Sequence, residues 1–198
     1  MTGPTVKLLV FDGLADWEPA FALCAINRSG RFKIATVGFS REPVMSMGGL
    51  RLTPDAVISD VEPAGTAIFI MPGGDMWEQQ SNPEVVKLLD RLEAANVPIA
   101  AICAATLEVA RAGLTRKRRH TSNSLRYLRT AVPEYRDDKL YVDDLAVSDG
   151  GLITASGLGA IEFGREIMRQ LGIHSEEDIA SWFGMFKHGV IPAKWAPN

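Results

Sequence analysis

Short apolar runs alternate along this chain with longer segments in which apolar positions recur at helical spacing. The short runs predict buried strands, and the longer segments predict amphipathic helices. In the first half of the chain, strands are expected at 6–11, 32–39, 66–71 and 97–102, and helices at 16–29, 83–95 and from just after Cys103 to about Ala112. Residues 50–59 contain Pro54, which favours a peripheral strand or a hairpin.

The second half of the chain is less regular. The stretch "LAVSDGGLITAS" at 145–156 alternates around Asp-Gly-Gly, which predicts a hairpin. The stretch "RRHTSNSLRYL" predicts a short strand that passes into a helix. Two further helices are expected at 157–172 and 175–186, and Ser175 has the spacing of an N-cap that pairs with Asp178.

The apolar positions also predict which face of each helix is buried. In 83–95, Val85, Leu88, Leu89 and Leu92 form one stripe. In 16–29, Trp17, Phe21 and Cys24 stand at i, i+4 and i+7, so Cys24 is expected to pack in the core. Alternating strands and helices indicate an α/β fold: a three-layer α/β/α sandwich around a mostly parallel sheet, which binds ligands at the carboxyl ends of its strands.

Composition limits the class of protein. The chain has 198 residues, 46% of them hydrophobic, which suits one domain spanning 1–198. A net charge of −3 gives no indication of nucleic acid or an anionic membrane as a partner. Two cysteines form no disulfide framework, the N-terminus lacks a secretory pattern, and no apolar run reaches membrane-spanning length. We therefore expect a cytoplasmic protein.

Cys103 stands where the strand at 97–102 turns into a helix. On the first turn of a helix, unpaired N–H groups and the helix dipole favour a thiolate, so the pKa of this thiol is expected to fall. The small residues Ala104 and Ala105 permit the sharp turn of a nucleophile elbow. A buried structural cysteine fits the position equally well.

Two other loops leave strand ends with candidate chemistry. In "PGGD", the Gly74 and Asp75 amides could form an oxyanion hole with the Ala104 amide, although paired glycines usually mark only a turn. In "FDGLADWE", Glu18 is either a helix-capping carboxylate or a buried carboxyl that titrates high and gives a proton to Cys103. Asp12 and Asp16 compete for that role on spacing alone.

Together, "FDGLADWE", "MPGGD" and "AAIC" before a small-residue helix resemble the ThiJ/PfpI superfamily, which shares a flavodoxin-like fold with class I glutamine amidotransferases. The stretches "ADWE", "PIAAIC", "RHTSN" and "GLGAIEF" are similar to its bacterial branch of intracellular proteases or amidases. The resemblance runs from about Val6 to Leu171. It implies that Cys103 is the reactive cysteine, that Glu18 is its protonated partner and that Gly74 supplies an oxyanion amide. The resemblance also matches residues 156–163 to the family segment that runs from the last strand into the helix after it.

One departure from the family pattern concerns histidine. Many members place a histidine about twenty positions after the cysteine, and here that position is Asn123, with His120 three residues earlier. On an extended segment these two side chains point to opposite faces, so only one of them can line the site. Asn123 can bind a substrate but cannot act as a general base, which leaves a Cys–His dyad in doubt. His120 is more simply interpreted as a strand residue bonded to the backbone.

The sequence predicts a cysteine-dependent hydrolase or amidase in which Cys103 attacks an electrophilic carbon. The alternatives are deglycase or glyoxalase chemistry on reactive carbonyls, and a stress-response redox sensor or chaperone that uses oxidation of Cys103. We expect a small-molecule or peptide substrate, no cofactor and no metal site, since the three histidines are far apart. Trp77 is either a wall of the site or a packing residue. The resemblance implies a homodimer.

Overall fold

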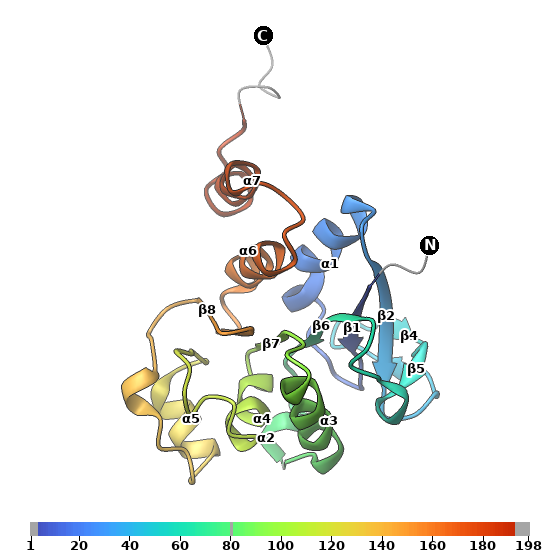
Figure 1. Cartoon of the computed structure of the whole chain (residues 1–198), viewed down its shortest axis with the longest axis vertical. Coiled ribbons are helices and arrows are strands. Elements are labelled where there is room, and N and C mark those ends of the chain that lie inside the picture. The colour runs from blue at the N-terminus through green and yellow to red at the C-terminus, as the bar shows by residue number, and fades with distance from the viewer. Residues whose placement is uncertain (1–3, 80, 193–198) are drawn as a thin grey trace.

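The central sheet has seven strands in the order β5-β2-β1-β6-β7-β9-β8 (Figure 1). This computed structural model describes residues 4–79 and 81–192. Every neighbouring pair in the sheet is parallel except β8 and β9. The strands are β1 (Thr5–Leu9), β2 (Lys33–Gly38), β5 (Ala56–Val57), β6 (Thr66–Met71), β7 (Ile99–Ile102), β8 (Ala146–Asp149) and β9 (Leu152–Ala155).

Helices cover both faces of this sheet, as expected for the α/β class. Figure 1 shows α1, α6 and α7 on one face, and α2, α3, α4 and α5 on the other. Their bounds are α1 (Trp17–Ser29), α2 (Met76–Gln79), α3 (Pro83–Ala94), α4 (Ala105–Arg111), α5 (Leu125–Ala131), α6 (Ala160–Leu171) and α7 (Glu176–His188). The three-layer α/β/α sandwich predicted from the sequence is confirmed.

The core lies where the middle strands meet the helices. The register pairs Leu8 with Ile70, Ile70 with Ala100 and Ala100 with Ile153, so four neighbouring strands form one buried layer. All four residues of β7 are buried, which explains its continuous apolar sequence. The predicted stripe of α3 is buried as expected, and the Asn82 side chain caps that helix by accepting from the Glu84 and Val85 N–H groups.

Residues 50–59 divide into two short pieces on either side of Pro54. The strand β4 (Arg51–Leu52) pairs antiparallel with β3 (Val44–Met45) in a separate hairpin. Strand β5 then joins the edge of the main sheet, and the 3₁₀ turn η1 (Ile58–Asp60) follows. A second 3₁₀ turn, η2 (Asp138–Leu140), lies before β8. The expected strand at "RRHTSN" is reduced to a single bridge between His120 and Tyr141.

Glycine makes the predicted hairpin at 145–156 possible. Gly150 and Gly151 have φ of 54° and 82°, and two consecutive positive φ values match the twist of the strands that they join. The capping prediction at α7 is also confirmed, because the Ser175 side chain accepts a hydrogen bond from the Asp178 N–H.

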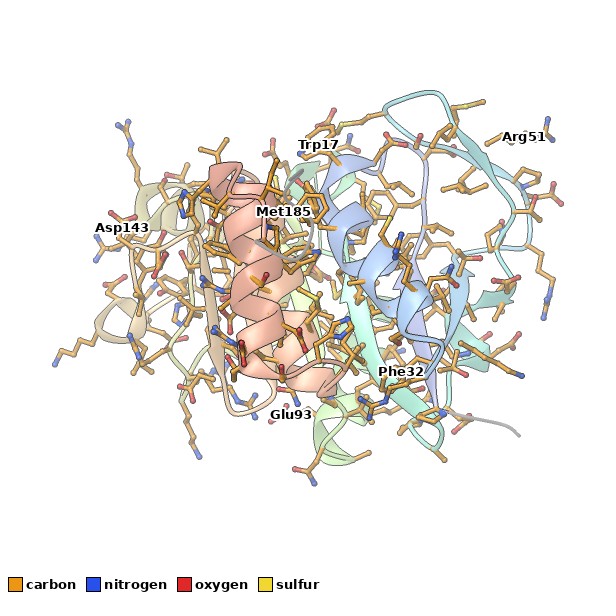
Figure 2. The ribbon with its side chains drawn as sticks, turned by 90° about the horizontal axis from the view of Figure 1, so that it is seen from above. Trp17, Phe32, Arg51, Glu93, Asp143 and Met185 are labelled. Carbon is orange, nitrogen blue, oxygen red and sulfur yellow. The ribbon has the colours of Figure 1, made fainter. Side chains whose placement is uncertain are left out.

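The predicted buried face of α1 is wrong. Its buried side chains are Glu18, Pro19, Ala22, Ala25 and Ile26, whereas Trp17 is 52% exposed and Cys24 is exposed. The helix packs closely on α6, and small residues on its inner face allow that approach. Trp17 is the first residue of α1 (Figure 2). Farther along, the Phe21 ring contacts Trp182 and Phe186 of α7.

Candidate active site

Cys103 lies at a sharp turn between β7 and α4. Its φ is 59°, in the left-handed region that residues with a side chain seldom adopt. The Cys103 N–H donates to the Ala155 carbonyl of β9 at 2.9 Å, and the Thr106 hydroxyl donates to the Cys103 carbonyl at 2.6 Å. These bonds hold a strained backbone that directs the thiol away from the strand, which is the geometry of a nucleophile elbow.

Glu18 brings a buried carboxyl to this thiol from the start of α1. It is 1% exposed, and its Oε2 accepts a hydrogen bond of 2.5 Å from the Gly73 N–H. Its Oε1 has no hydrogen-bond partner of good geometry among the described residues. Burial raises the pKa of this carboxyl, and the bonds to Gly73 and Cys103 only partly offset the increase. Of the two interpretations that the sequence left open for Glu18, the buried position matches that of a carboxyl beside Cys103.

The thiol pKa moves opposite to the expected direction. Burial, followed by the charge of the Glu18 carboxylate, raises the pKa of Cys103 to about 11. Hydrogen bonds from the Asn123 side chain and the Ala104 N–H lower the pKa, but by less. The sequence prediction took account of the helix N-terminus, which lowers a thiol pKa. It did not take account of the desolvation by burial, which raises the pKa. Because the two acids interact, the Glu18–Cys103 pair is considered together. It holds one proton at any pH between the raised pKa of Glu18 and the Cys103 pKa of about 11.

Asn123 connects the sulfur to the loop that follows β9. Its Nδ2 lies 3.4 Å from Cys103 Sγ, and its Oδ1 lies 2.9 Å from the Gly157 N. Because an N–H can only donate, Oδ1 must face Gly157, and Nδ2 therefore donates to the sulfur. A side chain at position 157 would not fit, since a Cβ there would lie 2.9 Å from Sγ. Sequence reasoning placed 156–163 in the family segment but did not identify Gly157.

The glycine that lies against the cysteine is Gly73, which the sequence reasoning did not single out, since it named Gly74 as a donor to the oxyanion. A Cβ at Gly73 would lie 2.7 Å from Cys103 Cβ and 2.8 Å from Glu18 Oε2. A Cβ at Gly74 would instead lie 2.6 Å from the Phe11 ring. The Gly74 and Asp75 N–H groups make no hydrogen bond to a described residue, so both are free to donate. The adjacent glycines predicted the loop but not which of them lies against Cys103.

The other carboxylates of the first loop hold structure together. Asp12 accepts from the Met45 N–H at 2.8 Å, and Asp16 accepts from the Gly48 N–H at 2.6 Å. A hydrogen bond from Ser46 is the main reason that the pKa of Asp16 is lowered. Both side chains thus tie the β3–β4 hairpin to the loop before α1, which leaves Glu18 as the carboxyl beside Cys103.

The two remaining candidates, His120 and Trp77, make their side-chain hydrogen bonds with residues other than Cys103. His120 is fully buried: its Nδ1 donates to the Arg118 carbonyl at 2.8 Å, and its Nε2 accepts from the Tyr135 hydroxyl at 2.6 Å. Burial lowers the pKa of this imidazole. Trp77 is also fully buried, donates to the Pro72 carbonyl and meets the Phe11 ring edge-to-face. These contacts favour the packing interpretation that the sequence offered for each of them.

The described residues form no other obvious functional centre. Across residues 4–79 and 81–192, no group of three or more His, Cys, Asp or Glu side chains is arranged to hold a metal ion. Within the same part of the chain, no helix combines the length and the apolar character needed to cross a membrane.

Comparison with known proteins gives a consistent result. The model of the DJ-1/PfpI family matches residues 4–170. The chain is 33% identical over 190 residues to the uncharacterized protease YoaZ of Bacillus subtilis, covering 92% of this chain and 90% of that protein. It is 32% identical over 182 residues to the uncharacterized protease YdeA of the same organism, covering 91% and 90%.

Solved structures agree with these relatives. The DJ-1 superfamily protein Atu0886 from Agrobacterium tumefaciens superposes with a TM-score of 0.86 at 32% identity, covering 94% of this chain and 98% of that one. The thiJ/pfpI family protein from Bacillus anthracis gives a TM-score of 0.88 at 30% identity, covering 95% and 92%.

Proposed function

Because this chain belongs to the DJ-1/PfpI family, we propose that it is a cysteine-dependent hydrolase or amidase with Cys103 as its nucleophile. The observation that carries the proposal is the half-buried thiol at a strained elbow, which Glu18 and Asn123 both contact. Strained backbone is retained where a residue must be held in one reactive position. The names of the two Bacillus subtilis relatives, which include the word protease, support the same class.

The reaction begins when Cys103 Sγ bonds to the carbonyl carbon of the substrate. The C=O π electrons move to oxygen, and the free N–H groups of Gly74 and Asp75, with that of Ala104, stabilise the oxyanion. The thiol proton moves to the Glu18 carboxylate, which passes it to the leaving group as the C–N or C–O bond breaks. Water then hydrolyses the thioester, which releases the acid and restores the thiol.

The substrate should carry an activated carbonyl. Among the described residues, no histidine lies beside Cys103, so a strong general base for cleaving ordinary peptide bonds is lacking. Esters, activated amides and α-oxoaldehydes need less assistance. A deglycase or glyoxalase activity is the second candidate, because a buried carboxyl of raised pKa can return a proton to the carbon from which it was taken. A redox sensor that uses oxidation of Cys103 is the third candidate, and the oxidation measurement below separates it from the two enzymes.

The test compares the wild type with Cys103→Ala and Cys24→Ala on a p-nitrophenyl ester, an amino-acid anilide and methylglyoxal. We expect Cys103→Ala to lower kcat/KM for the responsive substrate by ~1,000-fold or more, as loss of a nucleophile does. Cys24→Ala, which removes an exposed thiol, should match the wild type. Unchanged kcat/KM in Cys103→Ala overturns the mechanism. Addition of two oxygens to Cys103 by dilute peroxide, without turnover of any of the three substrates, would favour the sensor.

We further propose that a second copy of the chain covers the exposed apolar surface around α1 and α7. Trp17 is 52% exposed and Phe186 47%, and α7 contributes only one fully buried side chain, Ile179. Exposed apolar surface of this kind is typical of an interface between proteins. Sedimentation equilibrium should give twice the chain mass for the wild type and one chain mass for Trp17→Glu. A monomeric wild type overturns this proposal.

A further inference from the structure

One hydrogen bond joins the two segments that border the proposed nucleophile. The Tyr127 hydroxyl of α5 donates to Glu78 Oε1 of α2 at 2.8 Å. Helix α2 begins soon after the Gly73–Gly74 loop, and α5 begins just after Asn123. The bond therefore spans from the loop on one side of Cys103 to the segment that carries the Asn123 amide on the other.

Both helices are short and need such a connection. Helix α2 spans Met76–Gln79 and α5 spans Leu125–Ala131, and each packs on α4 (Figure 1). Arg111 of α4 links them at the far end of α5, donating to the Trp77 carbonyl at 2.9 Å and to the Ala131 carbonyl at 3.4 Å. At the end of α5 nearest Asn123, the link between the two helices is made by Tyr127 and Glu78.

The Tyr127 ring lies between the two apolar clusters of the protein. It packs against the main core and also against the smaller cluster of Leu107, Leu128 and Val132. Burial, then the bond to and the charge of Glu78, raise the pKa of Tyr127, and the charge of Cys103 contributes further. Tyr127 is thus within electrostatic range of the sulfur.

We propose that Tyr127 and Glu78 form a latch that holds the Asn123 segment against the Gly73–Gly74 loop and so positions the Asn123 amide on Cys103 Sγ. This inference rests on the proposed function, and it adds Tyr127 as a positioning residue that acts through Asn123. The latch fixes one side of the space that a substrate enters, and it leaves the chemistry to Cys103 and Glu18. Because Glu78 is exposed, it accepts the tyrosine bond without a large cost of burial.

The test measures alkylation of Cys103 by iodoacetamide against pH, read by peptide mass spectrometry, which needs no substrate. Tyr127→Phe keeps the ring and removes the bond to Glu78. Since the Asn123 bond lowers the thiol pKa, loosening it should move the alkylation midpoint to higher pH and slow the neutral-pH rate by ~3- to 10-fold, the effect of about one hydrogen bond. Glu78→Ala should give the same result, and the double variant should lose no more than either single variant.

Two comparisons separate positioning from general destabilisation. In an Asn123→Ala background, Tyr127→Phe should change the alkylation profile no further, because its target is already absent. Glu84→Gln, which alters an exposed carboxylate of α3 that bonds to no other described side chain, should match the wild type. An unchanged profile in Tyr127→Phe, or an equal additional loss in the Asn123→Ala background, overturns the latch. Either result leaves the role of Cys103 intact, because turnover by Cys103→Ala tests that role separately.

Discussion

The two cysteines of this chain have the same side chain and opposite surroundings. Cys24 lies exposed on the regular helix α1, and its thiol makes no hydrogen bond with a described residue. Cys103 is half-buried at a φ of 59°, beside a carboxyl that is 1% exposed. Burial and the charge of Glu18 raise the pKa of Cys103 to about 11. The comparison teaches that the elbow and its neighbours, and not the thiol itself, create the candidate site.

The neighbours of Cys103 are also specific to it. Gly73 and Gly157 leave space that a Cβ would fill, and Asn123 donates to the sulfur. Nothing similar surrounds Cys24, which makes it an internal reference for every measurement on Cys103. The first two changes below alter the surroundings of Cys103 and leave those of Cys24 as they are, and the third replaces each cysteine in turn.

The largest effect is expected from Glu18→Gln. Glutamine carries no charge, so the pKa of Cys103 should fall below about 11 and alkylation at alkaline pH should become faster. Glutamine also cannot accept and return a proton, so turnover should fall by ~100-fold or more. Peptide mass spectrometry across a pH series gives the first result, with Cys24 alkylation as the reference, and steady-state kinetics give the second. An unchanged alkylation midpoint would show that the carboxylate does not control the thiol.

A smaller effect is expected from Gly73→Ala. The new Cβ would lie 2.7 Å from Cys103 Cβ, so the elbow or Glu18 must shift. A displacement of this kind should lower kcat by ~100-fold and destabilise the fold by ~1–3 kcal/mol. The matched control is Gly184→Ala in α7, where the nearest atom would lie 3.9 Å away. The control should keep full activity and gain ~0.5–1 kcal/mol in unfolding free energy. Wild-type kinetics in Gly73→Ala would contradict close packing at the elbow.

The smallest effect is the difference in stability between a glycine and an alanine variant, which should have opposite signs at the two cysteines. At Cys103, whose φ is 59°, glycine relieves backbone strain, so Cys103→Gly should be more stable than Cys103→Ala by ~1 kcal/mol. At Cys24, in the middle of α1, glycine should be less stable than alanine by ~0.5–1 kcal/mol. Urea unfolding of the four variants gives both differences. The same sign at both positions would show that the elbow stores no strain.

The sequence predicted the fold well because the strands have a simple pattern. The run at Thr66–Met71 is buried almost throughout, and the stripe of α3 follows ordinary amphipathic spacing. The buried face of helix α1 was predicted wrongly because apolar residues recur at helical spacing on two of its faces. The stripe of Trp17, Phe21 and Cys24 has the larger side chains, but the face with Ala22 and Ala25 permits close contact with α6. Hydrophobicity alone does not separate a core face from an apolar surface.

The site was predicted in outline and missed in detail for physical reasons. The position of Cys103 at a strand end indicated the cysteine, the resemblance to the ThiJ/PfpI superfamily singled out Glu18 from Asp12 and Asp16, and alternation along an extended segment separated Asn123 from His120. The choice between Gly73 and Gly74 depends on a one-residue difference in the direction of the loop, which no periodicity encodes. The thiol pKa depends on how much water burial removes, and a sequence does not give that quantity.

The residues around Cys103 are spread along most of the chain, from Glu18 through Gly73 and Asn123 to Gly157. Each of these residues belongs to a different segment that connects strands of the sheet. The site around the sulfur therefore forms only after strands synthesised early and late have paired. Domains fold as units while they leave the ribosome. While β9 is still inside the ribosome, the Cys103 thiol of the growing chain is exposed to solvent. The Ala155 carbonyl and Gly157 do not yet lie beside it. Protection of this sulfur from alkylation would mark the moment at which a newly made chain completes its sheet.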